Sequence, residues 1–158
     1  MNKKSIIRFL VSISLPVAVG AVAGLFTASS VKTWFVTLNK PSFNPPSWLF
    51  APVWTTLYIV MGIAFFIIWQ SKANEIIKKR SMKIYFVQLF FNFTWSFVFF
   101  YAQQPGWALV NIVVLWLLIA ITIFWFSQIS RVSAWLMVPY ILWVSFATAL
   151  NYAIWQLN

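Results

Sequence analysis

The residues of this chain that could do chemistry are aromatic, and many of them gather around one proline-rich stretch. Between Trp34 and Tyr58 the sequence holds four prolines and three tryptophans. Proline fixes the backbone angle φ and removes a hydrogen-bond donor, so such a stretch is stiff. Each tryptophan adds a large flat ring with a single N–H donor. We therefore expect a rigid lid that carries aromatic plates over a pocket for a flat, apolar molecule.

Conventional catalytic groups are almost missing from the sequence. Glu75 is the only acidic residue, and there is neither cysteine nor histidine. This composition excludes a disulfide framework, a Cys/His zinc site and a haem ligated by His or Cys. It also excludes a Ser-His-Asp triad, a Cys-His pair and a pair of catalytic carboxylates. We expect no metal site and no tightly bound cofactor.

The composition is that of an integral membrane protein. Of the 158 residues, 63% are hydrophobic and 8% are charged, whereas a soluble domain is about half apolar and about a quarter charged. The net charge of +10 would suit nucleic acid, but the basic residues stand at the ends of apolar runs. That placement favours the lipid bilayer as the partner and argues against nucleic acid.

Five apolar runs are long enough to cross a bilayer, which takes about 20 residues in a helix. A membrane β-barrel needs strands of about 10 residues with alternating polarity, and these runs are longer and do not alternate. We predict an all-α membrane protein, a bundle of five transmembrane helices in a single domain over residues 1–158. The expected helices cover about residues 6–26, 48–69, 84–102, 106–126 and 134–155, with an outer loop at 27–47.

The basic residues predict how the chain lies in the membrane. The first run could be a signal peptide, but its apolar stretch exceeds the usual length of about 7–15 residues, so we interpret it as an uncleaved helix. With five passes, one face then carries the N-terminus, the loops 70–83 and 127–133, and nine of the eleven basic residues. The positive-inside rule places this face in the cytoplasm and the first loop outside the cell membrane.

The tryptophans fall into two groups by their position along the spans. Those near predicted helix ends are typical of the aromatic belts at membrane interfaces. Trp34 and Trp48 also flank the proline loop, so both interpretations stay open for them. Four others lie one or more turns inside a span, where an indole N–H needs a partner or a wet cavity. These four are Trp54, Trp95, Trp116 and Trp143.

Aromatic, small and amide side chains recur along three spans at steps of three or four, and such residues share one face of a helix. The three faces are Trp54, Tyr58, Gly62 and Phe65; Gln88, Asn92, Trp95 and Phe99; and Trp143, Ala147 and Asn151. Two interpretations remain: amides that join helices by hydrogen bonds, or the walls of an aromatic cavity under the lid. The tryptophans inside the spans favour the cavity.

Two glycines in the first span, Gly20 and Gly24, are four residues apart. Small residues at this spacing let two helix backbones approach closely. The contact could lie within the chain or join two copies of it. We expect a homodimer.

Three long sequence patterns run through the chain. One is W-Y-x-x-L-x-K-P-x-F-x-P-P-x-W-x-F-x-P-V-W-x-x-L-Y-x-x-M-G from Trp34 to Gly62, with Phe35 in place of its tyrosine. The others are Q-L-x-x-N-x-x-W-S-x-x-F-F at residues 88–100 and P-Y-x-x-W-x-x-x-A-x-x-L-N at residues 139–151. With these patterns the chain resembles the translocator protein/tryptophan-rich sensory protein (TspO) family, also called the peripheral benzodiazepine receptor family.

The resemblance implies a five-helix bundle, usually a homodimer, with a cavity near the first loop. It implies binding of porphyrins, above all protoporphyrin IX, and of sterols and benzodiazepine-type drugs. In some bacterial members it also implies light-dependent degradation of protoporphyrin IX, and the pair of residues concerned falls here on Trp54 and Trp143. The expected ligand-binding residues are Phe35, Pro45, Trp48, Trp54, Tyr58, Asn92, Trp95, Trp143, Phe146, Ala147 and Asn151. Phe35 lacks the phenolic hydroxyl of the family pattern, so no role of that hydroxyl is carried over.

A porphyrin is a flat π-system with two carboxylates, and aromatic walls suit its ring. Lys32 and Lys40 could meet the carboxylates or be solvated loop charges. Because there is no His or Cys to bind iron, we expect a metal-free porphyrin as ligand or substrate.

Three functions remain open at this point. The first, which we favour, is a receptor or sensor that binds porphyrins and degrades them in light. The second is a transporter or carrier of tetrapyrroles, sterols or other amphipathic molecules. The third is a purely structural membrane protein. An odd number of spans gives no inverted repeat, and the spans offer no charge for a proton relay, which weakens active transport.

Overall fold

The structure, a computed structural model, describes residues 2–158 and consists of helices joined by short connections. The elements are α1 (Lys3–Lys32), α2 (Trp34–Thr37), α3 (Ser47–Gln70), α4 (Glu75–Ser96), the π-helix η1 (Phe97–Tyr101), α5 (Pro105–Ser127), α6 (Arg131–Leu136) and α7 (Val138–Leu157). Five helical segments of the described chain are long and apolar enough to cross a bilayer, with α4 and η1 forming one and α6 and α7 another. This confirms the predicted fold class.

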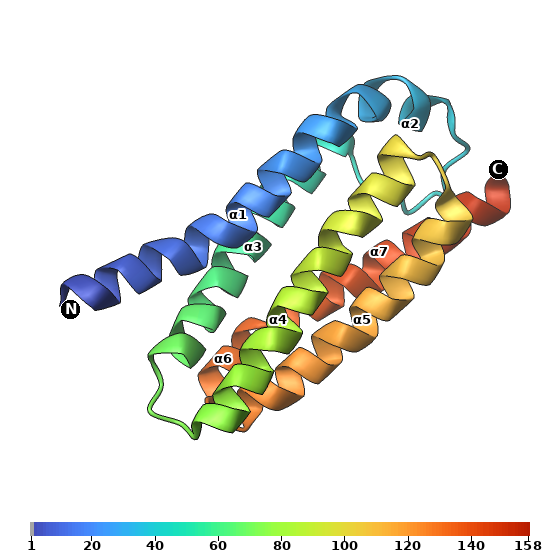
Figure 1. The fold of residues 1–158 in the computed structure, drawn as a ribbon. Coiled ribbons are helices and arrows are strands. Elements are labelled where there is room, and N and C mark those ends of the chain that lie inside the picture. Colours follow the sequence, from blue (N-terminus) through green and yellow to red (C-terminus); the bar gives the residue numbers. More distant parts are fainter. Residues whose placement is uncertain (1) are drawn as a thin grey trace.

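The helices form one elongated bundle (Figure 1). α1 packs along α3, α4 packs against α5, and α5 packs against α7. The N-terminal end of α1 lies at one end of the bundle, and α2 lies at the other end near the C-terminus. The chain therefore runs along the bundle five times, in agreement with the five apolar runs of the sequence.

The helices extend beyond the apolar runs, so the outer loop is shorter than expected. α1 continues to Lys32, and α2 covers residues 34–37, where the sequence predicted a loop from residue 27. At the other end, Asn74 caps α4, since its side chain accepts a hydrogen bond from the backbone N–H of Ile76 at 2.9 Å. Hydropathy marks only the part of a helix that needs lipid, whereas caps and polar turns set where the helix ends.

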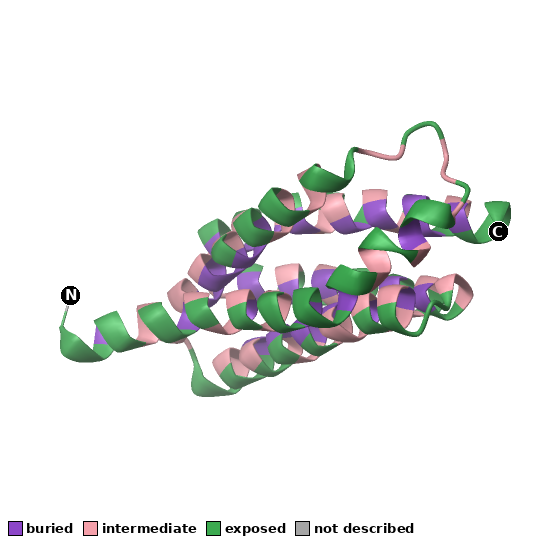
Figure 2. Ribbon diagram, turned by 90° about the horizontal axis from the view of Figure 1, so that it is seen from above, coloured by how far each residue is buried: buried purple, intermediate pink, exposed green. Residues whose placement is uncertain are grey.

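Buried residues lie on the inward faces of the helices, and much of α1 is exposed (Figure 2). Several large side chains at the centre have no exposed surface, namely Met61, Ile68, Tyr85, Tyr140 and Phe126. The outer faces are also apolar, with Phe90 and Leu142 more than half exposed. Because lipid is as apolar as these side chains, close packing and hydrogen bonds between helices hold the bundle together.

Glycines allow α1 and α3 to lie close together. A Cβ added at Gly62 would stand 2.6 Å from the carbonyl oxygen of Ser12. A Cβ added at Gly20 would stand 2.1 Å from Cε2 of Tyr58, whereas one added at Gly24 would meet no atom within 4 Å. Gly20 therefore serves a contact within the chain, whereas Gly24 packs against no other residue.

The turn from α4 to α5 has an irregular backbone. The N–H of Ala102 donates to the carbonyl of Phe97, five residues earlier, at 2.9 Å. This π-helical turn lies beside the cavity described below, and π-turns inside helices are frequent at functional sites. Gln103 follows in the left-handed region with φ 54°, the only non-glycine residue of the described chain with positive φ.

Candidate functional site

A cavity of about 380 Å³ lies between α1 and α3, under α2. Ligand pockets typically have about 300–1,000 Å³, so this one falls within that range. The α1 side is built from small residues, and the opposite side is aromatic. The aromatic lining consists of Phe35, Phe50, Trp54, Tyr58, Trp95 and Phe100. The cavity therefore has small side chains on its α1 side and aromatic rings on the opposite side.

Trp54 is the centre of this aromatic lining. Its ring stacks on Tyr58 with centroids 5.7 Å apart and lies 6.1 Å from the ring of Trp95. Tyr140 meets it edge-on at 6.3 Å. These are the spacings at which aromatic pairs attract each other, so Trp54 is held as part of a continuous aromatic cluster.

A second, much smaller space of about 20 Å³ lies next to the cavity and is lined by α7 residues. Trp143, Ala147 and Asn151 line this space but not the larger cavity. Five aromatic residues line both spaces, namely Phe35, Phe50, Trp54, Trp95 and Phe100. The sequence predicted one cavity with α7 as a wall. The structure instead has two spaces, because aromatic rings, the indoles of Trp54 and Trp95 among them, lie between α7 and α1.

Trp143 has an unused donor. Its indole N–H is buried and finds no hydrogen-bond partner among residues 2–158. The ring packs 5.4 Å from Phe146 and 6.2 Å from Phe50. A buried donor without a partner is unfavourable, so this N–H is available to an acceptor on a bound molecule.

Two of the predicted amides are engaged within the protein. Asn92 accepts a hydrogen bond from the hydroxyl of Tyr58 at 2.7 Å and donates one to the hydroxyl of Tyr140 at 3.0 Å. Asn151 accepts one from the indole of Trp95 at 3.1 Å and donates to the carbonyl of Pro105 at 2.8 Å. Both amides join helices, and their effect on the cavity is to position Tyr58 and Trp95.

The proline loop lies over α7 and the chain's C-terminal end. Phe43 packs edge-on against Phe146 at 6.3 Å. The backbone of Asn39 donates to the side chain of Asn158 at 2.9 Å, and the Asn158 side chain donates back to the Asn39 carbonyl at 3.0 Å. Trp48 is 71% exposed, and neither Trp48 nor Pro45 lines the cavity. These two predicted contacts are thus outside it in this structure.

Lys40 is placed over the aromatic cluster from the loop side. Its Nζ stands 4.9 Å from the ring centroid of Phe35, which is 4% exposed and lines the cavity. The same Nζ donates to the carbonyls of Leu38 at 3.0 Å and Val36 at 3.3 Å. The ammonium is therefore fixed near the rim of the cavity by backbone contacts and by a cation–π contact.

The α1 wall was not identified residue by residue from the sequence. It consists of Val17, Gly20, Ala21, Ala23, Gly24, Thr27 and Val31. These small or short side chains recur at helical spacing on one face of the helix. That recurrence was the available signal, but a face of small residues is equally typical of helix packing.

The residues that the structure describes offer no group of three or more His, Cys, Asp or Glu side chains that could hold a metal ion. Chemistry in the cavity and the smaller space beside it would rest on aromatic rings, on the Trp143 N–H and on the Lys40 ammonium at the rim.

Fold and site together define a multi-pass α-helical membrane protein with an aromatic cavity near one end of its bundle. Residues 12–156 match the TspO/MBR family. The chain belongs to this family, and this membership supports a role as a membrane sensor or transporter.

Individual relatives agree with this assignment. The chain is 42% identical to the tryptophan-rich protein TspO of Chlorobaculum tepidum over 160 residues, which cover 100% of this chain and 99% of that protein. It is 39% identical to the human translocator protein over 127 residues, 79% of this chain and 75% of that protein. It is 34% identical to the tryptophan-rich sensory protein of Cereibacter sphaeroides, over 96% of this chain and 90% of that protein.

Proposed function

We propose that this protein is a membrane receptor or sensor for porphyrins, with protoporphyrin IX as the ligand, and that related flat apolar molecules such as benzodiazepine-type drugs enter the same site. The observation that carries the proposal is the position of Trp54. This indole is a wall of both the larger cavity and the smaller space beside α7. A flat ring that displaced Trp54 and Trp95 would join the two spaces and lie between small residues on α1 and aromatic residues on α7.

The polar groups around the site fit the edges of such a ligand. The Lys40 ammonium at the rim can meet a carboxylate of the porphyrin, and an ion pair there would be charge-assisted. The unpartnered Trp143 N–H can donate to the ligand from the other side. In this arrangement a metal-free porphyrin needs no axial ligand from the protein.

The proposal includes light-dependent degradation of the bound porphyrin. The porphyrin absorbs the light, and dioxygen is the oxidant. Trp54 and Trp143 are the electron-rich groups assigned to this step, where they would supply an electron or capture a reactive oxygen product. Their rings line the same small space, so both would touch a ligand that occupied it.

Replacing both indoles tests this assignment. We expect Trp54→Phe/Trp143→Phe to bind protoporphyrin IX in the dark, seen as a shift of the porphyrin absorption band, but to bleach it at least about tenfold more slowly in light, a change of about 1.4 kcal/mol in the barrier. Trp116→Phe is the matched control, because the Trp116 indole donates to Ser145 at 2.8 Å and lines neither space. If the double variant bleached the porphyrin at the wild-type rate, the assignment of Trp54 and Trp143 to this step would be wrong.

A second candidate function is passive carriage of amphipathic molecules, and the shape of the cavity favours it specifically. Exposed residues such as Gly24, Ala51 and Thr55 belong to the cavity lining. The cavity thus has a mouth at the side of the bundle, between α1 and α3, through which a molecule could pass to and from the lipid. Binding without bleaching, together with faster transfer of porphyrin between vesicles, would favour carriage over degradation.

A further inference from the structure

Trp95 stands between the two spaces of the candidate site and is fixed there by a hydrogen bond. Its side chain is 7% exposed and lines both the cavity of about 380 Å³ and the space of about 20 Å³. Its indole N–H donates to Oδ1 of Asn151 at 3.1 Å. The Trp54 ring also lines both spaces, and aromatic contacts with Tyr58 and Trp95 hold it. Of these two indoles, Trp95 is thus the one whose position depends on a directional bond.

The amide that holds Trp95 is itself fixed from the other side. Asn151 is 2% exposed, and its side-chain N–H donates to the carbonyl oxygen of Pro105, the first residue of α5, at 2.8 Å. Turning the amide away from Trp95 would also break this second bond. The Asn151 oxygen therefore stays in place when the indole moves, so the bond between Trp95 and Asn151 can break and re-form while α5 and α7 remain joined.

Aromatic rings surround the rest of the Trp95 side chain. Its ring centroid lies 5.8 Å from that of Phe99, 6.1 Å from that of Trp54 and 6.2 Å from that of Phe100. Phe99 and Phe100 belong to η1, and π-helical turns are frequent at functional sites. A flat aromatic ligand can replace these ring contacts with its own, but apolar rings cannot replace the acceptor at Asn151. The hydrogen bond is therefore the contact that opposes displacement of Trp95.

We propose that Trp95 is a gate between the cavity and the space beside α7, and that Asn151 is the positioning residue that keeps this gate closed. With its indole bonded to Asn151, Trp95 is part of the wall between the two spaces. Once the bond breaks, the ring can move, and a flat ligand in the cavity reaches Trp143, which lines the smaller space. The affinity for such a ligand is then reduced by the fraction of molecules whose gate is open. This inference rests on the proposed function for the identity of the ligand, whereas the gate itself does not depend on that function.

Hydrogen exchange of the Trp95 indole in the ligand-free protein tests the gate without any porphyrin. With isotope-labelled tryptophan in the full chain, Trp95→Phe identifies the Trp95 signal among the indole N–H signals. Asn151→Leu has a side chain of similar size without polar atoms, and we expect it to speed exchange of the Trp95 indole at least about tenfold, because local opening governs exchange. The Trp116 indole, which donates to Ser145, should exchange as in wild type. An unchanged rate for Trp95 in Asn151→Leu would overturn the proposal.

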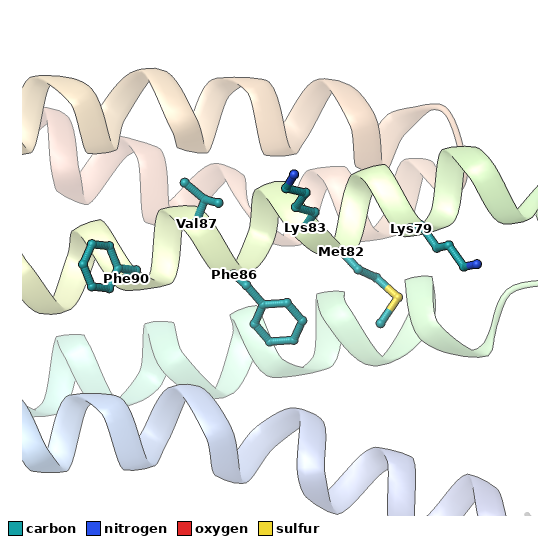
Figure 3. Close-up of a pocket in the computed structure, with 6 residues that line it drawn as sticks. All are labelled: Lys79, Met82, Lys83, Phe86, Val87 and Phe90. Carbon is teal, nitrogen blue, oxygen red and sulfur yellow. The ribbon is translucent and has the colours of Figure 1, made fainter.

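A change elsewhere on α4 controls for general loosening of that helix. Figure 3 shows Phe90 among the side chains that line a hollow on the surface of α4, and this hollow is separate from both spaces of the site. Phe90 precedes Trp95 by little more than one helical turn. Phe90→Leu should therefore leave exchange of the Trp95 indole at the wild-type rate. An increase as large as that in Asn151→Leu would show that any disturbance of α4 frees the indole, and would overturn the role of Asn151.

Porphyrin binding distinguishes a gate from an amide that only stabilises the fold. In a dark titration with protoporphyrin IX, Asn151→Leu should bind about threefold to tenfold more tightly than wild type, because losing one hydrogen bond of ordinary strength raises the open fraction by about that factor. Gln88→Leu is the matched control, since Gln88 is a buried amide that accepts from Tyr140 at 3.1 Å and lines neither space. It should lower the unfolding temperature without tightening binding.

The outcomes separate the gate from the proposed function. Equal or weaker porphyrin binding by a folded Asn151→Leu variant, when wild type binds, would overturn the gate. If wild type itself did not bind protoporphyrin IX, the proposed function would fail, and the exchange rate of the Trp95 indole would still decide whether Asn151 holds the gate closed.

Discussion

At the scale of single residues, the candidate site depends on how each aromatic side chain is fixed. Tyr58 is held by Asn92, and Trp95 is held by Asn151. Residue spacing predicted that these side chains share faces of their helices. It could not show that the two amides are used within the protein, because that depends on which neighbouring helix supplies a partner. Spacing likewise could not show that the Trp143 N–H is buried without a partner among residues 2–158.

Gly20 and Gly24 should respond differently to the same substitution. Gly20→Ala would drive a methyl group into the Tyr58 ring, whereas Gly24→Ala would meet no atom within 4 Å. We expect Gly20→Ala to destabilise the protein by about 1–3 kcal/mol through overpacking. Gly24→Ala should be neutral or stabilising by up to about 1 kcal/mol through helix propensity. Thermal unfolding in detergent measures both, and equal effects would contradict the packing described here.

Asn92 should contribute to stability through its two tyrosine partners. Asn92→Ala leaves the buried Tyr58 hydroxyl without its partner, and an unsatisfied buried group costs about 1–3 kcal/mol. Asn111→Ala is the control, since the half-buried Asn111 side chain makes one hydrogen bond, to Thr94 at 2.9 Å. We expect the control to lose less than about 1 kcal/mol. Denaturant unfolding in micelles compares the two, and a smaller loss for Asn92→Ala would refute this role.

At the scale of elements, the five spans were predictable because lipid requires long apolar helices. Their ends were not, since Thr27 and Lys32 are polar yet helical, and a helix can continue outside the hydrocarbon layer. The π-helix at Phe97–Tyr101 was also not predicted. One extra residue in a turn leaves no mark on hydropathy, but it changes the direction in which Phe99 and Phe100 point.

The α4–α5 turn offers a test at the scale of elements. Gln103 has φ 54°, and the left-handed conformation costs a residue with a side chain about 1–2 kcal/mol. Gln103→Gly should therefore stabilise the protein, by up to about 1 kcal/mol after the entropy of glycine in the unfolded chain is counted. Gln104→Gly is the control, because Gln104 has a negative φ of −117°. A lower unfolding temperature for Gln103→Gly than for wild type would contradict this reading of the turn.

At the scale of the whole molecule, the sequence placed the site under the first loop and between helices, and the structure has a cavity there. The division into two spaces could not be predicted. It depends on the orientation of Trp54 and Trp95 inside the bundle, which sequence spacing does not determine. The aromatic surface of α7 is present, but it meets the cavity only through aromatic rings that line both spaces.

The distribution of charge predicts an orientation for the whole molecule. The loop that contains Ser42 should face outward, and the end of the bundle that contains Gln128 should face the cytoplasm. The chain has no cysteine, so Ser42→Cys and Gln128→Cys, both at exposed positions, each provide a single label site. In intact cells an impermeant maleimide should label only Ser42→Cys, and after lysis both variants. Labelling of only Gln128→Cys in intact cells would reverse the orientation.

The central claim is that the cavity between α1 and α3 binds the porphyrin, and filling it tests this most directly. Gly24 lines the cavity and faces empty space, so Gly24→Leu should occupy it without unfolding the protein. Ser29→Leu places the same side chain at an exposed position of α1 that is outside the cavity lining. In a dark titration with protoporphyrin IX, we predict that Gly24→Leu raises Kd at least about tenfold, or about 1.4 kcal/mol, and that Ser29→Leu leaves it unchanged. A wild-type Kd for a folded Gly24→Leu variant would contradict the account.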